Sequence, residues 1–589
     1  MMKKYIIIAF AATIVGLSSC DMLDKEPLAQ MSPENFFSTE NELEAFSNTF
    51  YTIFPSTDLY SESVDNVIGL ELSEEVRGAR VIPASGGDWT WETLRNINTM
   101  LGNIGNCEDV DVRRRYEGLA RFFRAYFYFE KVKRFGDVPW YDKELSSTDP
   151  ELYKPRDSRE YVMQKLLADL DYAIEYLPSE KSLYKVTKWT ALALKSRACL
   201  FEGTFRKYHG LAIEGGKDWQ WYLQECADAS YEFIASSGYS IYKVGGTAAA
   251  YRNLFVSVET SGAEVILARD FNKSLNVVHN SNYRTMSASF GRPGITRRIV
   301  ASYLMANGNR FTDNPDWETM EFVEETKNRD PRLAQSIRTP GYKRIGGSAL
   351  VAPDFTACVT GYQPTKYVGS SAHDGYNKSY LDLIIFRAAE IYLNYAEAKA
   401  ELGTLSQNDL AISVNKIRAR VNMPDMDVSA ANASPDPFLM SKENGYPNVT
   451  GPNAGVILEI RRERTIELLG EGHRYFDMVR WKEGKSFEQP LLGMYFPGPG
   501  EYDLNGDGVN DLHLYKGKTP SSTTSKLLLK IGQDILLTDG DKGCVFPHKG
   551  NTGRWNESRD YLYPIPSDDR SLTNGALLQN PGWNDGLDF

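Results

Sequence analysis

Residues 118–140 constrain the fold of this chain more than any other stretch. Apolar side chains recur in it every three or four residues, the spacing that places them on one side of a helix. They are Leu119, Phe122, Phe123, Tyr126, Phe127, Phe129, Val132 and Phe135. Gly136 suits a helix C-terminus, and Pro139 prevents the helix from resuming. Since a fully buried Phe contributes about 1.5–3 kcal/mol, the pattern predicts a helix at the centre of a large helical core.

Further helical patterns lie on both sides of this segment. Apolar spacing and cap signals predict helices near 39–55, 88–106, 156–177, 188–203 and 219–236, and again near 381–403, 406–421 and 457–470. Ala198 and Gly203 are matched by Ala398 and Gly403, and we expect each Gly to end its helix. Small Ala residues let paired helices approach closely, as in tetratricopeptide hairpins. The chain is therefore expected to be mainly α, with a scaffold of helix pairs.

Residues 245–378 interrupt the helical pattern. A short strand is predicted at 264–271, and the remainder is rich in Gly, Asn, Ser and Arg. Long irregular segments on a rigid scaffold are where binding sites usually lie.

Arg and Glu alternate along residues 457–470. Such a row could mark a phosphate or carboxylate site. The opposite charges recur three and four residues apart, however, which favours a helix face that neutralises itself.

Composition and motif searches limit the possible functions. The net charge is −12, which argues against a nucleic-acid partner because phosphate binding needs clustered Lys and Arg. The sequence has no HExxH, GxSxG or phosphate-binding Gly loop, so we expect neither an enzyme nor a catalytic cofactor. Apart from Cys20 there are five Cys and no CxxC, so no disulfide framework is expected, and Cys199 fits a buried thiol.

Residues 1–19 have the features of a lipoprotein signal peptide. Lys3 and Lys4 precede an apolar run that is too short to cross a bilayer comfortably. The sequence LSSC at 17–20 is typical of a bacterial lipobox, so we expect Cys20 to begin the mature protein and to carry acyl chains such as palmitate, which hold it at a membrane. The alternative is an ordinary secretory signal with a chance Cys.

Residues 503–511, DLNGDGVND, have the pattern of a calcium loop. Asp503, Asn505 and Asp507 place oxygen atoms at alternate positions, and Gly508 permits a sharp turn. Val509 could add its carbonyl oxygen, and Asp511 could bind directly or through water. An EF-hand would have a Glu where this chain has Leu514, so a metal-free turn is the alternative to structural Ca²⁺.

Five segments, in this order, resemble the SusD/RagB family of surface nutrient-uptake lipoproteins: 118–140, 188–202, 381–403, 457–484 and 561–583. The resemblance implies a mainly α fold, a tetratricopeptide-like scaffold with a long, irregular, partly β insertion. The resemblance also implies that residues 20–589 form a single SusD-like body. Its parts are an N-terminal helical part (38–236), a ligand-facing insertion (245–378), a C-terminal helical part (379–484) and a loop-rich C-terminal segment (485–589).

Candidate ligand residues are aromatic or polar side chains in the loops. Sugars stack their apolar C–H faces on flat rings, while their hydroxyl groups bond to polar side chains. The candidates are Asp65, Trp89, Trp91, Tyr283 and Trp317. Trp89 precedes a predicted helix and is expected to be more exposed than Trp91, and Trp317 has polar neighbours. Local packing is the alternative role for each ring.

The resemblance implies a non-catalytic protein held at the outer membrane by its lipid. It would bind an oligosaccharide or polysaccharide and deliver it to a SusC-like TonB-dependent transporter. A peptide ligand, as in the RagB branch, is the alternative, and a surface protein without any ligand is the third possibility. A peptide site would offer a groove for backbone pairing and fewer exposed rings.

Overall fold

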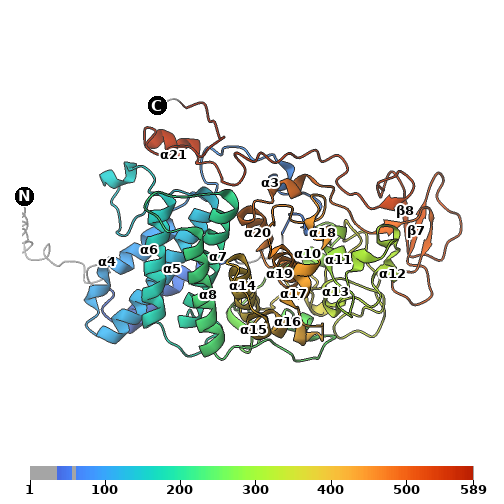
Figure 1. Cartoon of the computed structure of the whole chain (residues 1–589), viewed down its shortest axis with the longest axis horizontal. Helices are drawn as coiled ribbons and strands as arrows, with labels where there is room; N and C mark the ends of the chain where they lie inside the picture. The colour runs from blue at the N-terminus through green and yellow to red at the C-terminus, as the bar shows by residue number, and fades with distance from the viewer. Residues whose placement is uncertain (1–35, 56–61, 588) are drawn as a thin grey trace, which may run out of the picture.

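The computed structural model describes residues 36–55, 62–587 and 589. Figure 1 shows that helices dominate the molecule and form two groups. The first comprises α2 (Glu40–Ser47), α4 (Glu92–Asn103), α5 (Val110–Phe135), α6 (Arg159–Tyr176), α7 (Lys188–His209) and α8 (Trp219–Ser236). The short α3 (Glu74–Arg77) lies outside this group. The second comprises α14 (Ala388–Glu401), α15 (Gln407–Ile412), α16 (Val414–Arg420), α17 (Val428–Ala433), α18 (Pro437–Met440), α19 (Ala454–Glu467) and α20 (Arg474–Arg480). The expected mainly α fold is confirmed.

Helix α5 is the aromatic helix predicted at 118–140, with further turns at its N-terminus. Asp109 caps it by accepting hydrogen bonds from the backbone N–H groups of Asp111 and Val112. Gly136 follows its last residue with a φ of +73°, which glycine adopts without strain. Phe122, Phe129 and the other predicted apolar positions are buried, and α5 packs against α4, α6 and α7. The helix therefore has the central place that its composition indicated.

Helix α7 continues past the predicted end at Gly203 and stops at His209, where Gly210 is the cap. Gly203 has a different role, because a Cβ atom there would lie 2.7 Å from Cγ of Leu223 on α8. The residue allows two helices to approach closely. Gly403, with a φ of +74°, does follow α14 as a terminator. The predicted equivalence of the two glycines is therefore wrong.

Short helices, turns and small strands fill the insertion. Its helices are α9 (Ala250–Leu254), α10 (Ser281–Met286), α11 (Arg297–Ser302), α12 (Phe322–Glu325) and α13 (Pro331–Ser336). The predicted strand is present as β2 (Val265–Arg269), which pairs antiparallel with β4 (Leu383–Arg387), and β1 (Val67–Ile68) pairs with β3 (Gly294–Ile295). The segment 381–403 thus begins as a strand. The helix expected at 406–421 is divided at Ser413, whose φ and ψ are −128° and −100°.

The charged residues of α19 are mostly buried and pair mainly with other elements, which differs from the self-neutralised face predicted for this helix. One pair of the predicted kind, Glu459 with Arg462 at 3.2 Å, lies within the helix. Glu467 accepts hydrogen bonds from Arg387 at 2.8 Å and Arg332 at 3.2 Å, and also from Arg420. Arg464 pairs with Asp477 of α20 at 2.8 Å. A buried charge is tolerated only when it is paired. These ion pairs join the insertion to the second group of helices.

The C-terminal segment returns across the molecule. It forms β5 (Tyr495–Phe496) with β9 (Gly543–Cys544), and a sheet of β6 (Gly500–Tyr502), β7 (Leu512–Tyr515) and β8 (Leu527–Lys530) in which β7 and β8 are parallel. Figure 1 shows this sheet at one end of the molecule and α21 (Ser567–Leu572) near the first group of helices. The backbone N–H of Tyr563 donates to the carbonyl of Arg134 on α5 at 2.7 Å. This bond fixes the returning chain just before α21.

The predictions for the N-terminus fall outside the described residues. Cys20 and the signal peptide lie there, so lipid attachment stays a prediction. Within the described ranges, no helix combines the length and the apolar character needed to cross a membrane. The five described Cys are free thiols, and Cys199 is buried as predicted.

Candidate functional site

A pocket of about 640 Å³ lies where α4, the loop after α5 and α21 meet. The contributions from α4 and the turn before it are Trp89, Trp91, Glu92, Leu94, Arg95 and Asn98. The loop contributes Pro139, Tyr141, Lys143, Leu145, Ser146, Ser147, Leu152 and Tyr153, and the C-terminal segment contributes Asp569, Leu572, Thr573 and Leu577. Its size is typical of a site that encloses a small organic ligand. We call it the aromatic pocket.

Trp91 is the central ring of the aromatic pocket. It lies 5.5 Å from Tyr141, at an interplanar angle of 77°, and 5.2 Å from Trp89. Trp91 is half-buried, whereas Trp89 is 4% exposed and packs on Phe135 at 4.8 Å. The prediction that Trp89 would be the more exposed of the two is therefore wrong. Asp88 has a φ of +64°, so the chain turns just before Trp89.

A buried cation supports Trp91 from within the core. The ammonium of Lys131 on α5 lies 5.5 Å from the centre of the Trp91 ring and donates to the backbone oxygen of Asp88. Burial lowers the pKa of Lys131 to about 8. A cation beside an indole ring is attracted by its negative face. The contact helps to fix the orientation of Trp91 before any ligand arrives.

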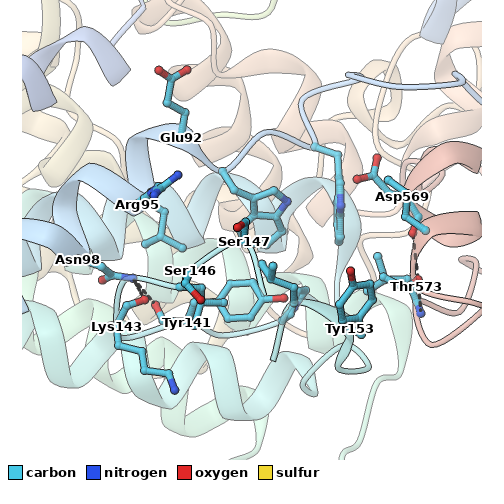
Figure 2. Close-up of a pocket in the computed structure, with 18 residues that line it drawn as sticks. Glu92, Arg95, Asn98, Tyr141, Lys143, Ser146, Ser147, Tyr153, Asp569 and Thr573 are labelled. Atoms are coloured by element: carbon cyan, nitrogen blue, oxygen red, sulfur yellow. Dashed lines mark hydrogen bonds between the residues drawn. The ribbon is translucent and has the colours of Figure 1, made fainter. Parts of the chain in front are cut away.

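Polar groups hold the loop that forms one side of the pocket. The Asn98 amide donates to the backbone oxygens of Tyr141 at 3.0 Å and Lys143 at 3.2 Å. Figure 2 shows Tyr141 and Tyr153 reaching the same space, with Asp569 and Thr573 entering from the side of α21. Burial raises the pKa of Asp569, and its neighbour Asp568 adds to the effect. The pocket thus combines fixed rings with a few polar groups.

This arrangement suits a ligand that has both apolar faces and hydroxyl groups. Tyr153 is 53% exposed and Leu572 is 72% exposed, so apolar surface at the rim is open to solvent. Aromatic side chains supply a large contact area with few rotatable bonds, so little entropy is lost when a ligand binds. The chemistry available is binding by stacking and hydrogen bonding.

The structure does not bring the other predicted ligand residues to the aromatic pocket. Tyr283 lies in the insertion beside Phe290 and Tyr376, each at 5.5 Å. Trp317 is half-buried and packs on Phe438 at 5.5 Å, which differs from the exposure expected of it. Neither residue lines the pocket, so the rings of the sequence-based set do not form one site.

Asp65 lies in a buried ion-pair cluster. Its carboxylate accepts from Arg474 at 2.6 and 2.8 Å and from Arg298 at 2.7 Å. Burial alone would raise the pKa of Asp65, but Arg474 and Arg298 together hold it below the usual value. The side chain is 0% exposed, so in this structure it is not available to a ligand.

Sequence reasoning did not identify Tyr141, Tyr153 and Asp569 as site residues. Tyr141 lies in the loop after α5, and Tyr153 ends a short 3-10 helix (Pro150–Tyr153) in the same connection. This connection has no periodicity, although it directly follows the most recognisable helix of the chain. A search for aromatic residues just after that helix could have found Tyr141. Asp569 is more than four hundred residues further on, and no local pattern indicates that its helix returns to this site.

The predicted calcium loop is a compact turn. Asp503 accepts from the backbone N–H of Gly508 at 2.8 Å, and Asp511 accepts from that of Leu504 at 3.0 Å. The Asn505 amide donates to Asp507 at 3.1 Å. Across the part of the chain that the structure describes, no group of three His, Cys, Asp or Glu side chains is arranged to hold a metal ion. Calcium binding, including a role for Val509, stays a prediction.

Comparison with known proteins identifies the family. A family model described as "SusD family" matches residues 263–583, and one described as "Starch-binding associating with outer membrane" matches residues 88–200. SusD-like protein P25 of Formosa agariphila is 22% identical to this chain, in a match that covers 82% of this chain and 90% of the relative. SusD-like protein P38 of the same organism is 24% identical, in a match that covers 81% of this chain and 91% of the relative. The crystal structure of a SusD-like protein from Bacteroides fragilis superposes with a TM-score of 0.68 at 23% identity, over 95% of this chain and all of that one. The crystal structure of a SusD-like carbohydrate binding protein from the same species superposes with a TM-score of 0.67 at 21% identity. This match covers 92% of this chain and 99% of that one. The chain belongs to the SusD family.

Proposed function

We propose that this protein is a non-catalytic carbohydrate-binding lipoprotein of the outer membrane, and that the aromatic pocket holds its ligand. The single observation that carries the proposal is the position of Trp91. Its ring is half-buried, faces a pocket with Tyr141 and Tyr153, and is fixed from the core side by Lys131. An oligosaccharide offers the stacking faces and hydroxyl groups that such a pocket accepts.

The comparisons support the same ligand class. One related crystal structure is of a carbohydrate binding protein, and one matching family model is described as starch-binding and associated with the outer membrane. In this proposal Cys20 carries the lipid, and the bound sugar passes to a SusC-like TonB-dependent transporter. Replacement of Cys20 with Ala should release the protein from the membrane fraction. Retention of the variant there would contradict a lipid anchor.

The peptide alternative is less well supported by the pocket. A bound peptide commonly adds a strand to an exposed sheet edge. The described residues that line the aromatic pocket come from helices and loops, with no strand among them.

The test is a binding assay on the form that lacks residues 1–20, against matched panels of oligosaccharides and peptides. We expect an oligosaccharide to bind. Trp91→Ala and Tyr153→Ala should each weaken binding about threefold to tenfold, because one aromatic contact contributes about 0.5–1.5 kcal/mol beyond its buried area. Tyr231→Ala is the matched control, since Tyr231 on α8 is 53% exposed, like Tyr153, and lies outside the pocket. Equal affinity in all three variants, or binding of peptides alone, would overturn the proposal.

A further inference from the structure

A second hollow adjoins the aromatic pocket. It has a volume of about 610 Å³ and lies between α4, α5 and α6, on the other side of the loop that carries Tyr141. Asn98 and Lys143 line both hollows. The Asn98 amide donates to the backbone oxygen of Lys143, so the loop is tied to α4 where the two spaces adjoin. We call this second space the polar hollow.

The polar hollow differs chemically from the aromatic pocket. Its ring is Trp140, which is 4% exposed and stacks on Tyr128 at 4.2 Å. The other lining groups are mostly charged or amide side chains: Asn98, Asn103, Glu117, Arg121, Arg124, Asp142, Lys143, Glu144, Lys165 and Asp169. Such a wall binds a ligand through hydrogen bonds more than through stacking.

Among the described residues, one donor of the hollow lacks a hydrogen-bond partner and two of its charged groups form no ion pair. Nε1 of Trp140 is buried and makes no hydrogen bond with any described residue. The carboxylate of Asp142 and the ammonium of Lys165 form no ion pair within the described ranges, whereas Arg124 holds Asp169 at 2.7 and 2.8 Å. A ligand can reach the carboxylate of Asp142, which is exposed, and the ammonium of Lys165, which is partly exposed, but not the enclosed nitrogen of Trp140.

The charges of both hollows are balanced. In the polar hollow the cations Arg121, Arg124, Lys143 and Lys165 face the anions Glu117, Asp142, Glu144 and Asp169. In the aromatic pocket Arg95 and Lys143 face Glu92 and Asp569. An acidic ligand needs an excess of positive groups to replace the water around its charges. Neither space offers that excess.

We propose that the aromatic pocket and the polar hollow are successive subsites for one extended, uncharged oligosaccharide. This inference rests on the proposed function and adds a ligand class to it. The chain stacks on Trp91 in the first subsite, passes over the loop at Lys143, and bonds through its hydroxyl groups to Asp142 and Lys165 in the second. A disaccharide fills only the first subsite.

The test measures affinity for neutral oligosaccharides from disaccharide to octasaccharide, and for uronate-containing chains of the same lengths. The variants Asp142→Ala and Lys165→Ala probe the polar hollow, and Trp91→Ala probes the aromatic pocket. Glu180→Ala and Lys518→Ala are the matched controls, since both residues are exposed and line neither space. Like Asp142→Ala and Lys165→Ala, each control substitution removes one charged side chain.

We expect affinity for neutral chains to rise with length. Asp142→Ala and Lys165→Ala should weaken octasaccharide binding about threefold to tenfold, the effect of one hydrogen bond, and should weaken disaccharide binding less. If both variants bind the octasaccharide like the wild type while Trp91→Ala still binds weakly, the second subsite is refuted and the proposed function stands. Preference for uronate chains would refute the uncharged ligand. Failure of the wild type to bind any oligosaccharide would refute the proposed function itself.

Discussion

Asp65 and Arg474 are 409 residues apart in sequence and form a buried, two-armed ion pair. Nε and one terminal nitrogen of Arg474 donate to the two carboxylate oxygens at 2.8 and 2.6 Å, and Arg298 adds a third contact at 2.7 Å. Arg474 begins α20, Arg298 lies on α11 of the insertion, and Asp65 lies just before β1. One carboxylate therefore joins the N-terminal region, the insertion and the second group of helices.

Asp65→Ala should lower the free energy of unfolding by about 3–5 kcal/mol, because it leaves buried guanidinium groups without their carboxylate. Urea unfolding followed by circular dichroism would measure the loss. Glu443→Ala is the control, since Glu443 is exposed and its pair with Lys442 is long, at 3.7 Å. A variant that kept its stability but lost sugar binding would contradict this structural role and restore Asp65 as a ligand contact.

Gly203→Ala should destabilise the protein although Ala favours helices. A Cβ atom at this position would lie 2.7 Å from Cγ and 3.1 Å from the backbone nitrogen of Leu223. Overpacking of this kind costs about 1–3 kcal/mol, which exceeds the gain of up to about 1 kcal/mol from helix propensity. Gly102→Ala on α4 is the matched control, because a Cβ atom there meets no other atom within 4 Å. This substitution should stabilise the protein. Equal melting temperatures for the two variants would show that α7 and α8 can separate without cost.

The local elements of the fold could be predicted because their signals lie in neighbouring residues. The apolar spacing of α5, the cap at Asp109 and the terminating Gly136 all act within a few turns of one helix. Gly203 was misinterpreted because its role depends on Leu223 of another helix. The prediction for α19 misses most of its ion pairs for the same reason, since Glu467 pairs with Arg387 and Arg420 of other segments.

The candidate site was predictable only in part. Trp91 is one of the predicted ligand residues and lines the pocket, but its place at the start of a helix led to the expectation that Trp89 would be the more exposed ring. Tyr283 and Trp317 were grouped with it by residue type and by resemblance, but the structure separates them from the pocket. The contribution of α21 depends on how the last segment crosses the molecule, and the bond from Tyr563 to Arg134 that fixes this crossing has no local sequence signal.

Stability should fall as the pH decreases below about 4.5. Burial alone would raise the pKa of Glu397, but Arg480 lowers it to about 2 from the model-compound value of 4.5. Above pH 4.5 this carboxylate is ionised in both states and its full contribution is present. As the pH falls from 4.5 towards 2, the unfolded chain takes up the proton first, and roughly 3 kcal/mol of stability is lost, at 1.36 kcal/mol per pKa unit.

The free energy of urea unfolding, measured from pH 6 to pH 3, tests this expectation. Glu397→Gln should be less stable than the wild type at pH 6 and should show a shallower decrease below pH 4.5. Glu180→Gln, at an exposed position, should follow the wild-type curve. If Glu397→Gln and the wild type had the same slope, the Glu397–Arg480 pair would not contribute to acid sensitivity.

Calcium should stabilise the turn at 503–511. Asp503, Asp507 and Asp511 bring three carboxylates into nine residues, and Gly506 and Gly508 have φ values of +77° and +83°, which allow the tight turn. In the structure these carboxylates accept backbone N–H groups, and only Asp511 contacts a cation, Lys526 at 3.1 Å. A rotation of the side chains would be needed to turn their oxygens towards an ion.

If Ca²⁺ binds only the folded protein, a free concentration of about 100 times Kd adds about 2.7 kcal/mol of stability. Thermal unfolding in a chelator should therefore occur at a lower temperature than in calcium, and Asp507→Ala should abolish the difference. Asp541→Ala is the control, since Asp541 is exposed and pairs with Lys516 outside the turn. Mg²⁺ should replace Ca²⁺ poorly, because it requires a smaller and more regular shell of oxygen ligands. Identical melting curves with chelator and with calcium would leave the turn as a metal-free connection, held by the hydrogen bonds between its carboxylates and its own backbone.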